Sequence, residues 1–310
     1  MDDGRKYAEH IPVLADAVLA GLLPDDQAVE RVIDGTLGAG GHTRLLIEAG
    51  VKHVLGLDVD PMALGIARKN LADLAERVTV AHASYADMIE AASDVGWGTV
   101  DAILLDLGIS SMQIDTAERG FAFMRDGPLD MRFNADSDGL TAADIVNHWD
   151  AGAMADIFFK YGEERHSRRI ARAVIDKRPF TTTSELAEAV RDAVPKGRQP
   201  IHPATRVFQA LRIAVNDELR TVEHALPDAI RLLRPGGWLG VISFHSLEDR
   251  IVKQTFKEAS TEIVSPPGMV LEEKAAEVRL INRKPITADD AEIEHNPRSR
   301  SAKLRVVEKL

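Results

Sequence analysis

Residues 32–42 read Val-Ile-Asp-Gly-Thr-Leu-Gly-Ala-Gly-Gly-His, and Asp58 ends a second apolar run sixteen residues after His42. The first apolar run predicts a buried strand that enters a glycine-rich turn and then a helix. Glycines in such a turn let backbone N–H groups approach a ligand closely. An acidic residue at the end of the next strand accepts hydrogen bonds from both hydroxyls of a ribose. The pairing therefore predicts a site for a ligand that carries a nucleoside.

The details of this turn favour S-adenosylmethionine over a dinucleotide. A G-x-G-x-x-G fingerprint that begins at Gly38 needs a glycine or alanine at position 43, where the chain has Thr43. The carboxylate of Asp34 would also repel a pyrophosphate. S-adenosylmethionine has no phosphate and carries an ammonium and a sulfonium group. The plain alternative is a glycine-rich turn without a ligand, because short motifs produce false matches.

The first third of the chain alternates between strands and helices. Strands are expected at residues 29–33, 54–58, 78–82 and 100–105, and helices at residues 42–49, 61–74 and 85–92. Continuous Val, Ile and Leu strands separated by helices are typical of a parallel sheet that is covered on both faces. Ligands of such sheets bind at the carboxyl ends of the strands, where Asp34, Asp58 and Asp106 fall.

The alternation stops after Ser110 and resumes near Arg212. Short helices are expected in between, at residues 141–147, 151–161, 163–177 and 184–193. A long helix with its buried face over residues 208–226, a strand at 238–244, a helix at 249–258 and final strands at 278–282 and 302–307 follow. We therefore predict an α/β, Rossmann-like sheet, formed by residues 1–112 and 213–310, that is interrupted by an all-helical insertion at residues 113–212.

The composition describes an ordinary globular protein, with 45% hydrophobic and 28% charged residues in 310. The sequence has no run of 18 apolar residues and no signal peptide, so we expect a cytoplasmic protein without a membrane segment. The chain has no cysteine, which excludes disulfides and thiolate metal sites. No histidine spacing supports a zinc site, so no metal is expected.

The charge is distributed unevenly along the chain, whose net charge is -11. Residues 1–150 hold 11 Lys and Arg against 26 Asp and Glu, and residues 216–294 hold 10 against 15. Residues 151–215 hold 12 basic against 7 acidic residues, and residues 295–310 hold 5 against 1. Two basic segments in an acidic protein indicate a local site for a polyanion.

One predicted helix, at residues 163–177, carries four arginines within an arc of about 100°. They are Arg165, Arg168, Arg169 and Arg172. Such a stripe suits contacts with phosphate groups. The alternative is a solvated face on which the arginines form ion pairs with Glu163 and Glu164.

The loop that begins at Asp106 follows the fourth predicted strand, where class I methyltransferases place the group that receives the reacting atom. The D/N/S-P-P-aromatic motif of DNA amino-methyltransferases is missing there. Residues 265–268, Ser-Pro-Pro-Gly, are similar to it but lack the aromatic residue, and we interpret them as ordinary loop chemistry. Residues 243–249 combine serine, histidine and carboxylates, but the absence of G-x-S-x-G argues against a hydrolase triad.

Several dense stretches of sequence carry a family resemblance. They are residues 118–123, 127–132, 202–206, 208–212, 243–250 and 296–301. With them the chain resembles the ribosomal RNA small-subunit methyltransferase H family, from Glu9 to Arg305. That family transfers a methyl group from S-adenosylmethionine to the N4 amine of a cytosine in 16S rRNA, in the decoding region of the small ribosomal subunit.

The resemblance implies a class I methyltransferase sheet with an inserted helical substrate domain. It implies cofactor contacts from Gly40, Gly41, His42, Asp58, Tyr85, Asp106 and Gln113. Position 85 is commonly Phe in the family, and Tyr85 keeps a ring for packing on adenine. Met112 replaces a usual proline, which puts the stiffness of that loop in doubt. The Phe133-Asn134 pair replaces a usual Met-Asp, so position 134 receives no role.

Two roles remain open for Asp106: it accepts a hydrogen bond or proton from the reacting amine, or it only binds the cofactor. Asp130, Arg132 and His245 are weaker candidates for positioning the substrate. The target base is expected to be single-stranded or flipped out. A non-catalytic RNA- or ribosome-binding protein is the alternative function, and Thr43 disfavours an NAD oxidoreductase. The oligomeric state stays open, a homodimer included.

Overall fold

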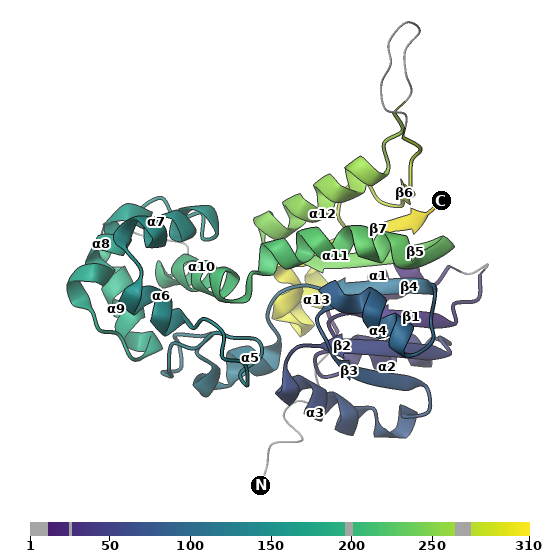
Figure 1. Ribbon diagram of the computed structural model, residues 1–310, viewed down its shortest axis with the longest axis horizontal. Helices are drawn as coiled ribbons and strands as arrows, with labels where there is room; N and C mark the ends of the chain where they lie inside the picture. Colours follow the sequence, from purple (N-terminus) through teal and green to yellow (C-terminus); the bar gives the residue numbers. More distant parts are fainter. Residues whose placement is uncertain (1–11, 25–26, 196–200, 264–273) are drawn as a thin grey trace, which may run out of the picture. The chain divides into compact units, whose positions relative to one another are not determined.

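The computed structural model describes residues 12–24, 27–195, 201–263 and 274–310 (Figure 1). The chain divides into two compact units, Met1–Gly108 with Leu219–Leu310 and, between them in sequence, Ile109–Glu218. We refer to them as the sheet unit and the helical unit. The Ser-Pro-Pro-Gly stretch at 265–268 and the start of the family resemblance at residues 9–11 lie outside the described residues.

The sheet unit contains one seven-stranded sheet in the order β3-β2-β1-β4-β5-β7-β6. The strands are β1 (Arg31–Asp34), β2 (His53–Asp58), β3 (Val78–His82), β4 (Val100–Asp106), β5 (Leu233–Ser243), β6 (Val278–Leu280) and β7 (Lys303–Lys309). Strands β1 to β5 pair in parallel, and β7 runs antiparallel between β5 and β6. The parallel sheet predicted from the sequence is confirmed, and its switch point lies between β1 and β4.

Helices cover both faces of this sheet. They are α1 (Ala15–Leu22), α2 (Gly41–Glu48), α3 (Pro61–Asn70), α4 (Met88–Asp94), α11 (Glu218–Leu232), α12 (Ser246–Ala259) and α13 (Asp290–His295), with the 3-10 turns η1 (Ala72–Leu74), η2 (Tyr85–Asp87) and η4 (Pro297–Ser301). Helices α4, α11 and α12 share one apolar core with the sheet, and α1 and α2 share another with its opposite face. The strands read as continuous apolar runs because both of their faces are buried.

The helical unit is built around its own apolar core. Its elements are α5 (Ser111–Asp115), η3 (Ala117–Arg119), α6 (Ala142–His148), α7 (Ala151–Lys160), α8 (Ser167–Lys177), α9 (Thr183–Ala193) and α10 (Ala204–Asn216). Phe158, Ile170 and Leu186 are fully buried there, and each such side chain contributes about 2 kcal/mol relative to an exposed position. A helical insertion between β4 and β5 is therefore confirmed.

Two helix boundaries differ from the sequence prediction for a local reason. The long helix expected around residues 208–226 is broken into α10 and α11 at Asp217, whose φ is 48°. Helix α8 begins at Ser167 rather than at residue 163, because Glu163 has a φ of 49°. A left-handed residue ends a helix, and aspartate tolerates this conformation better than most residues do. Arg165 therefore precedes the helix.

Candidate functional site

The glycine turn connects β1 to α2 and depends on left-handed backbone. Gly38 and Gly40 have φ values of 54° and 86°. A Cβ on Gly40 would also lie 2.7 Å from Leu71 Cδ1, so both conformation and space require glycine there. Helix α2 follows at Gly41 without a side-chain cap. The positive end of the helix dipole thus faces the carboxyl edge of the sheet, where it favours a carboxylate or another anion.

Asp58, at the end of β2, lies against this turn. Its Oδ2 accepts a hydrogen bond from Gly38 N at 2.8 Å, and its Oδ1 accepts one from Asp60 N at 2.9 Å. Burial raises the pKa of Asp58 to about 6, although both N–H donors lower it. Each oxygen accepts one backbone N–H and keeps a second lone pair, as a carboxylate that receives two ribose hydroxyls requires.

Asp34 explains why the chain has Thr43 in place of the small residue of a dinucleotide site. The Thr43 hydroxyl donates to Asp34 Oδ2 at 2.7 Å, and Thr36 N donates to Oδ1 at 3.3 Å. Asp34 is 1% exposed, and burial raises its pKa. The threonine therefore supplies a donor that a buried carboxyl needs, which a glycine or alanine could not do.

Asp106 ends β4 and presents the least satisfied carboxyl group of the site. Its backbone N–H donates to Thr36 Oγ1 at 2.7 Å, which holds the strand end against the glycine turn. Among the described residues its Oδ1 is buried and has no hydrogen-bond partner. Burial raises the pKa of Asp106 to about 6, and the charges of Asp34 and Glu248 act in the same direction. A buried carboxylate oxygen without a donor is poised to accept from a ligand.

His42 joins Asp106 through its imidazole ring. Nε2 lies 3.0 Å from the carbonyl oxygen of Val13, and Nδ1 lies 3.7 Å from Asp106 Oδ2. A carbonyl only accepts, so Nε2 carries the proton of the neutral ring. Nδ1 of the neutral ring then carries no hydrogen, and its lone pair lies on the side of Asp106.

The remaining predicted cofactor residues fall in both units. Tyr85 begins η2, and a Cβ on Gly35 would lie 3.0 Å from Tyr85 Cβ, so the base of this side chain lies against the start of the glycine turn. Gln113 belongs to the helical unit, where its Oε1 accepts from Ser110 N at 3.0 Å and Ser110 Oγ accepts from Gln113 N. This capping box begins α5.

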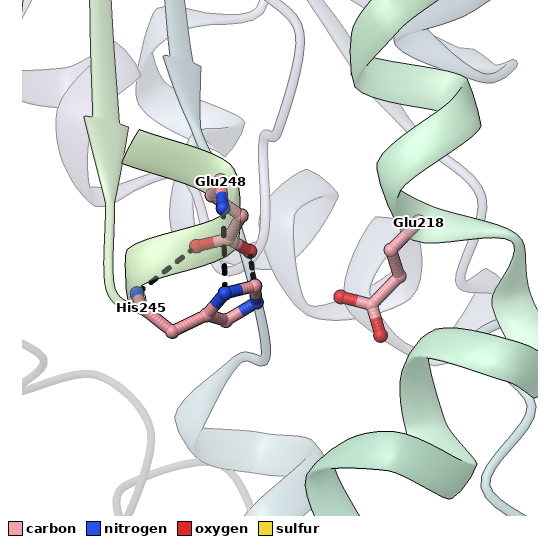
Figure 2. A group of neighbouring side chains, drawn as sticks. All are labelled: Glu218, His245 and Glu248. Atoms are coloured by element: carbon pink, nitrogen blue, oxygen red, sulfur yellow. Dashed lines mark hydrogen bonds and ion pairs between the residues drawn. The ribbon is translucent and has the colours of Figure 1, made fainter. Parts of the chain in front are cut away.

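His245 caps helix α12 at the end of β5, as Figure 2 shows. Its Nδ1 accepts from Glu248 N at 3.4 Å, so Nε2 carries the ring proton, and Nε2 lies 3.1 Å from Glu248 Oε1 outside hydrogen-bond geometry. Glu248 Oε2 accepts from Phe244 N at 2.9 Å. No sequence motif predicts a role for Thr36 or Val13 in this site. Glu248 does have a sequence signal, because a glutamate three residues after a helix cap is typical of a capping box.

The raised pKa of Asp106 makes the stability of the protein depend on pH. An acid whose folded pKa exceeds its unfolded value of 3.8 loses stabilising free energy as the pH rises from 3.8 through about 6. Asp106→Asn cannot ionise, so we expect it to exceed the wild type in free energy of unfolding by about 1–3 kcal/mol at pH 8. Urea denaturation at pH 5 and pH 8 measures this, and an equal difference at both values would contradict it.

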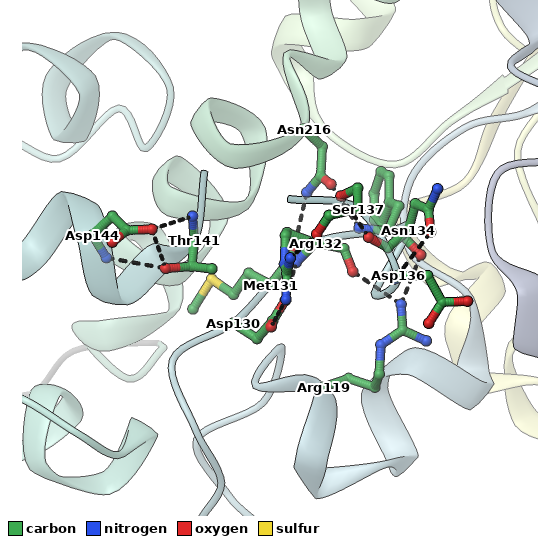
Figure 3. Close-up of polar contacts among 11 residues, drawn as sticks. Arg119, Asp130, Met131, Arg132, Asn134, Asp136, Ser137, Thr141, Asp144 and Asn216 are labelled. Atoms are coloured by element: carbon green, nitrogen blue, oxygen red, sulfur yellow. Dashed lines mark hydrogen bonds and ion pairs between the residues drawn. The ribbon is translucent and has the colours of Figure 1, made fainter. Parts of the chain in front are cut away.

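Asp130 and Arg132, predicted to contact the substrate, bind each other in the helical unit (Figure 3). Arg132 Nη2 lies 2.6 Å from Asp130 Oδ2, and Nε lies 3.0 Å from Oδ1. Asn216 holds the same loop, because its Oδ1 accepts from Phe133 N and its Nδ2 donates to Met131 O. The φ of Met131 is 66°, so the loop needs these contacts to stay in a strained conformation. A role of either residue toward RNA stays a prediction.

The arginine stripe is exposed in the helical unit. Its three helical members, Arg168, Arg169 and Arg172, lie opposite the buried face of α8. In the part of the chain that the structure describes, none of the four arginines forms an ion pair. Glu164 is one of the ion-pair partners expected if the stripe is only a solvated face, but it lies 3.8 Å from Arg206 instead. The stripe therefore keeps its full positive charge toward solvent.

The parallel sheet, its glycine turn and the acidic strand ends of β1, β2 and β4 define a class I methyltransferase. Within the described residues, no helix has the length and apolar character needed to span a membrane. The sequence profile of the MraW methylase family matches residues 7–310. The chain belongs to this family.

Individual relatives match nearly the whole chain. It is 50% identical over 312 residues to ribosomal RNA small subunit methyltransferase H of Magnetococcus marinus, covering 97% of this chain and 99% of the relative. The protein of the same name from Syntrophotalea carbinolica is 49% identical, and the alignment covers 99% of each chain. A solved structure of an rRNA methylase from Streptococcus thermophilus aligns over 96% of this chain and 93% of its own, with 13% identity and a TM-score of 0.42.

Proposed function

We propose that this protein transfers a methyl group from S-adenosylmethionine to the N4 amine of a cytosine in 16S rRNA of the small ribosomal subunit. The observation that carries the proposal is the 50% identity to a small-subunit rRNA methyltransferase over nearly the full length of both chains. The acidic strand ends support it, because they match a cofactor with a ribose and a cationic amino-acid end. We place the protein in the cytoplasm with the ribosome, and we propose a homodimer as its assembly.

The residues of the sheet unit fit the proposed cofactor. Asp58 binds the two ribose hydroxyls, and the ring of Tyr85 packs on the adenine. The N-terminus of α2, at Gly40, Gly41 and His42, receives the carboxylate of the methionine end. Asp106 receives its ammonium group or the substrate amine, and Gln113 keeps the cofactor role that the family resemblance implies.

The acceptor amine sets the chemical demand on Asp106. The lone pair of a cytosine N4 amine is delocalised into the ring, so the amine is a poor nucleophile. Bound S-adenosylmethionine supplies a methyl group on a sulfonium leaving group. The protein must hold the amine in line at about 3–3.5 Å and accept a hydrogen bond or the proton as positive charge develops on N4. The unsatisfied Oδ1 of Asp106 provides the acceptor.

The decisive experiment maps methylated cytosines. Small ribosomal subunits from cells that lack this protein, and 16S rRNA extracted from them, are incubated with the purified protein and S-adenosylmethionine. We expect one N4-methylated cytosine to appear in at least one of the two substrates. Tight RNA binding without methyl transfer to either substrate would overturn the proposal in favour of a non-catalytic RNA-binding protein.

The exposed arginine stripe gives a prediction about RNA affinity. Reversing two charges in Arg168→Glu with Arg172→Glu should weaken binding to small-subunit rRNA at least tenfold. It should also flatten the plot of log affinity against log salt by roughly 1.4, since a single-stranded phosphate contact contributes about 0.7. Filter binding over a salt series measures both quantities.

A matched control reverses two cations of the same unit that are already paired. Lys160 lies 3.4 Å from Asp156, and Arg191 lies 3.9 Å from Glu188. Lys160→Glu with Arg191→Glu changes the net charge equally but should leave the salt slope near the wild-type value. An unchanged slope in the Arg168 and Arg172 variant would show that RNA binds elsewhere.

A further inference from the structure

A basic groove lies along helix α12 in the sheet unit, at the opposite end of the strand order from β3. It has a volume of about 550 Å³. Its lining includes four cationic side chains and one carboxylate, namely Arg250, Lys253, Lys257, Lys274 and Glu258. This concentration of positive charge stands on a chain whose net charge is -11.

The cations follow the helical repeat. Arg250, Lys253 and Lys257 are spaced by three and four residues, so they share one face of α12. The buried face of the helix, which includes Val252 and Phe256, packs on the sheet. All three cations are therefore held at the surface by a helix whose position is set by the core, and not by a flexible loop.

The acidic residues of α12 contact groups other than Lys253 and Lys257. Asp249 binds Arg305, with Oδ1 at 2.7 Å from Nε, and Lys303, with Oδ2 at 3.5 Å from Nζ. Glu258 accepts a hydrogen bond from Gln254 at 2.9 Å. Lys253 and Lys257 consequently form no ion pair within the described ranges of the chain. Two lysines one helical turn apart repel each other, and a polyanion that binds both relieves this repulsion.

The groove is connected to the candidate site by the start of the helix. Helix α12 follows β5, in which Ile242 pairs with Asp106 of β4, so the first turn of the helix lies at the same edge of the sheet as that carboxyl. The cationic face begins at Arg250 and extends to Lys257, roughly 10 Å farther along the helix axis. A strand with one base at the Asp106 edge can therefore continue over this face.

We propose that this groove binds the phosphate backbone of the rRNA strand that flanks the target nucleotide. The inference rests on the proposed function for the identity of the polyanion, but its contacts are independent of the arginine stripe. Lys253 and Lys257 each neutralise one phosphate. The sheet unit thus contributes to RNA binding as well as to cofactor binding.

The test neutralises two charges in Lys253→Gln with Lys257→Gln and measures binding to small-subunit rRNA between 50 and 300 mM salt. We expect about tenfold weaker binding at 100 mM salt and a salt slope that is shallower by roughly 1.4. The affinity for S-adenosylmethionine, measured by calorimetry, should not change. Arg68→Gln with Lys69→Gln is the control, because these exposed cations lie on α3 at the other end of the sheet.

The two double variants separate the outcomes. A wild-type salt slope in the Lys253 and Lys257 variant overturns the inference, as does an equal loss in both variants, which would reflect overall charge. A loss of affinity without a change in slope also overturns it, because the groove would then bind a partner other than phosphate. Failure of the proposed function would give a different result. The wild-type protein would then transfer no methyl group, whatever the salt slopes of the variants.

Discussion

Asp106→Asn should lower the turnover of methyl transfer by about 10²- to 10⁴-fold and leave the affinity for S-adenosylmethionine within a fewfold of the wild type. Asparagine has the shape of aspartate but cannot take up a proton. The backbone contact from Asp106 N to Thr36 Oγ1 does not depend on the side chain, so the strand end stays in place. The variant therefore removes the negative charge and the group that takes up the proton, without removing the site.

The measurement separates chemistry from binding. Single-turnover rates report the methyl transfer step, and calorimetry reports the affinity for the cofactor. Asp87→Asn, an exposed carboxylate in η2 of the same unit, controls for the general loss of one negative charge and should retain wild-type turnover. Turnover near wild type in Asp106→Asn would rule out the acceptor role, and a loss of affinity for the cofactor would then support the second role left open by the sequence.

Asp58→Ala should weaken the binding of S-adenosylmethionine by about 100-fold or more. Hydrogen bonds to a charged acceptor contribute about 1.5–3 kcal/mol each, and two ribose hydroxyls lose their acceptor. The substitution also frees Gly38 N and Asp60 N, which together hold the turn. The loss of affinity thus has a direct part and a part that comes from the loosened turn.

A second variant separates these two parts. Asp58→Asn keeps one acceptor oxygen for the turn and loses the charge, and we expect it to weaken binding about tenfold. Calorimetry measures both variants, and the thermal stability of each without cofactor reports whether the turn has loosened. Asp87→Ala serves as the control. Wild-type affinity in Asp58→Ala would contradict the placement of the ribose, and binding of NAD by the wild type would contradict the choice of cofactor.

The sequence was informative wherever a local pattern has one physical solution. Continuous apolar strands are stable only when both faces are covered, which predicts the parallel sheet and its helices. Gly38 and Gly40 mark a turn with left-handed backbone at both residues, and at Gly40 the neighbouring Leu71 also leaves no space for a side chain. Asp58 could be predicted to lie near this turn because the carboxyl ends of parallel strands meet at one edge of the sheet.

The sequence was less informative about breaks and about partners of charged groups. The periodicity of residues 208–226 continues through Asp217, so nothing in the apolar pattern marks the left-handed residue that separates α10 from α11. The antiparallel insertion of β7 between β5 and β6 depends on pairing between distant segments. The sequence predicts that Arg132 contacts RNA but does not predict that its guanidinium binds Asp130.

By itself the sequence determined the class of the protein and the existence of a helical insertion, and it predicted the edge of the sheet where the cofactor binds, because these depend on short-range periodicity and on glycine geometry. Only the tertiary structure decided what the site carboxyl groups can do. Burial raises the pKa values of Asp58 and Asp106 to about 6. The packing of the chain places His42 between the Val13 carbonyl and Asp106. Desolvation is a property of packing, so no spacing of residues along the chain could have predicted it.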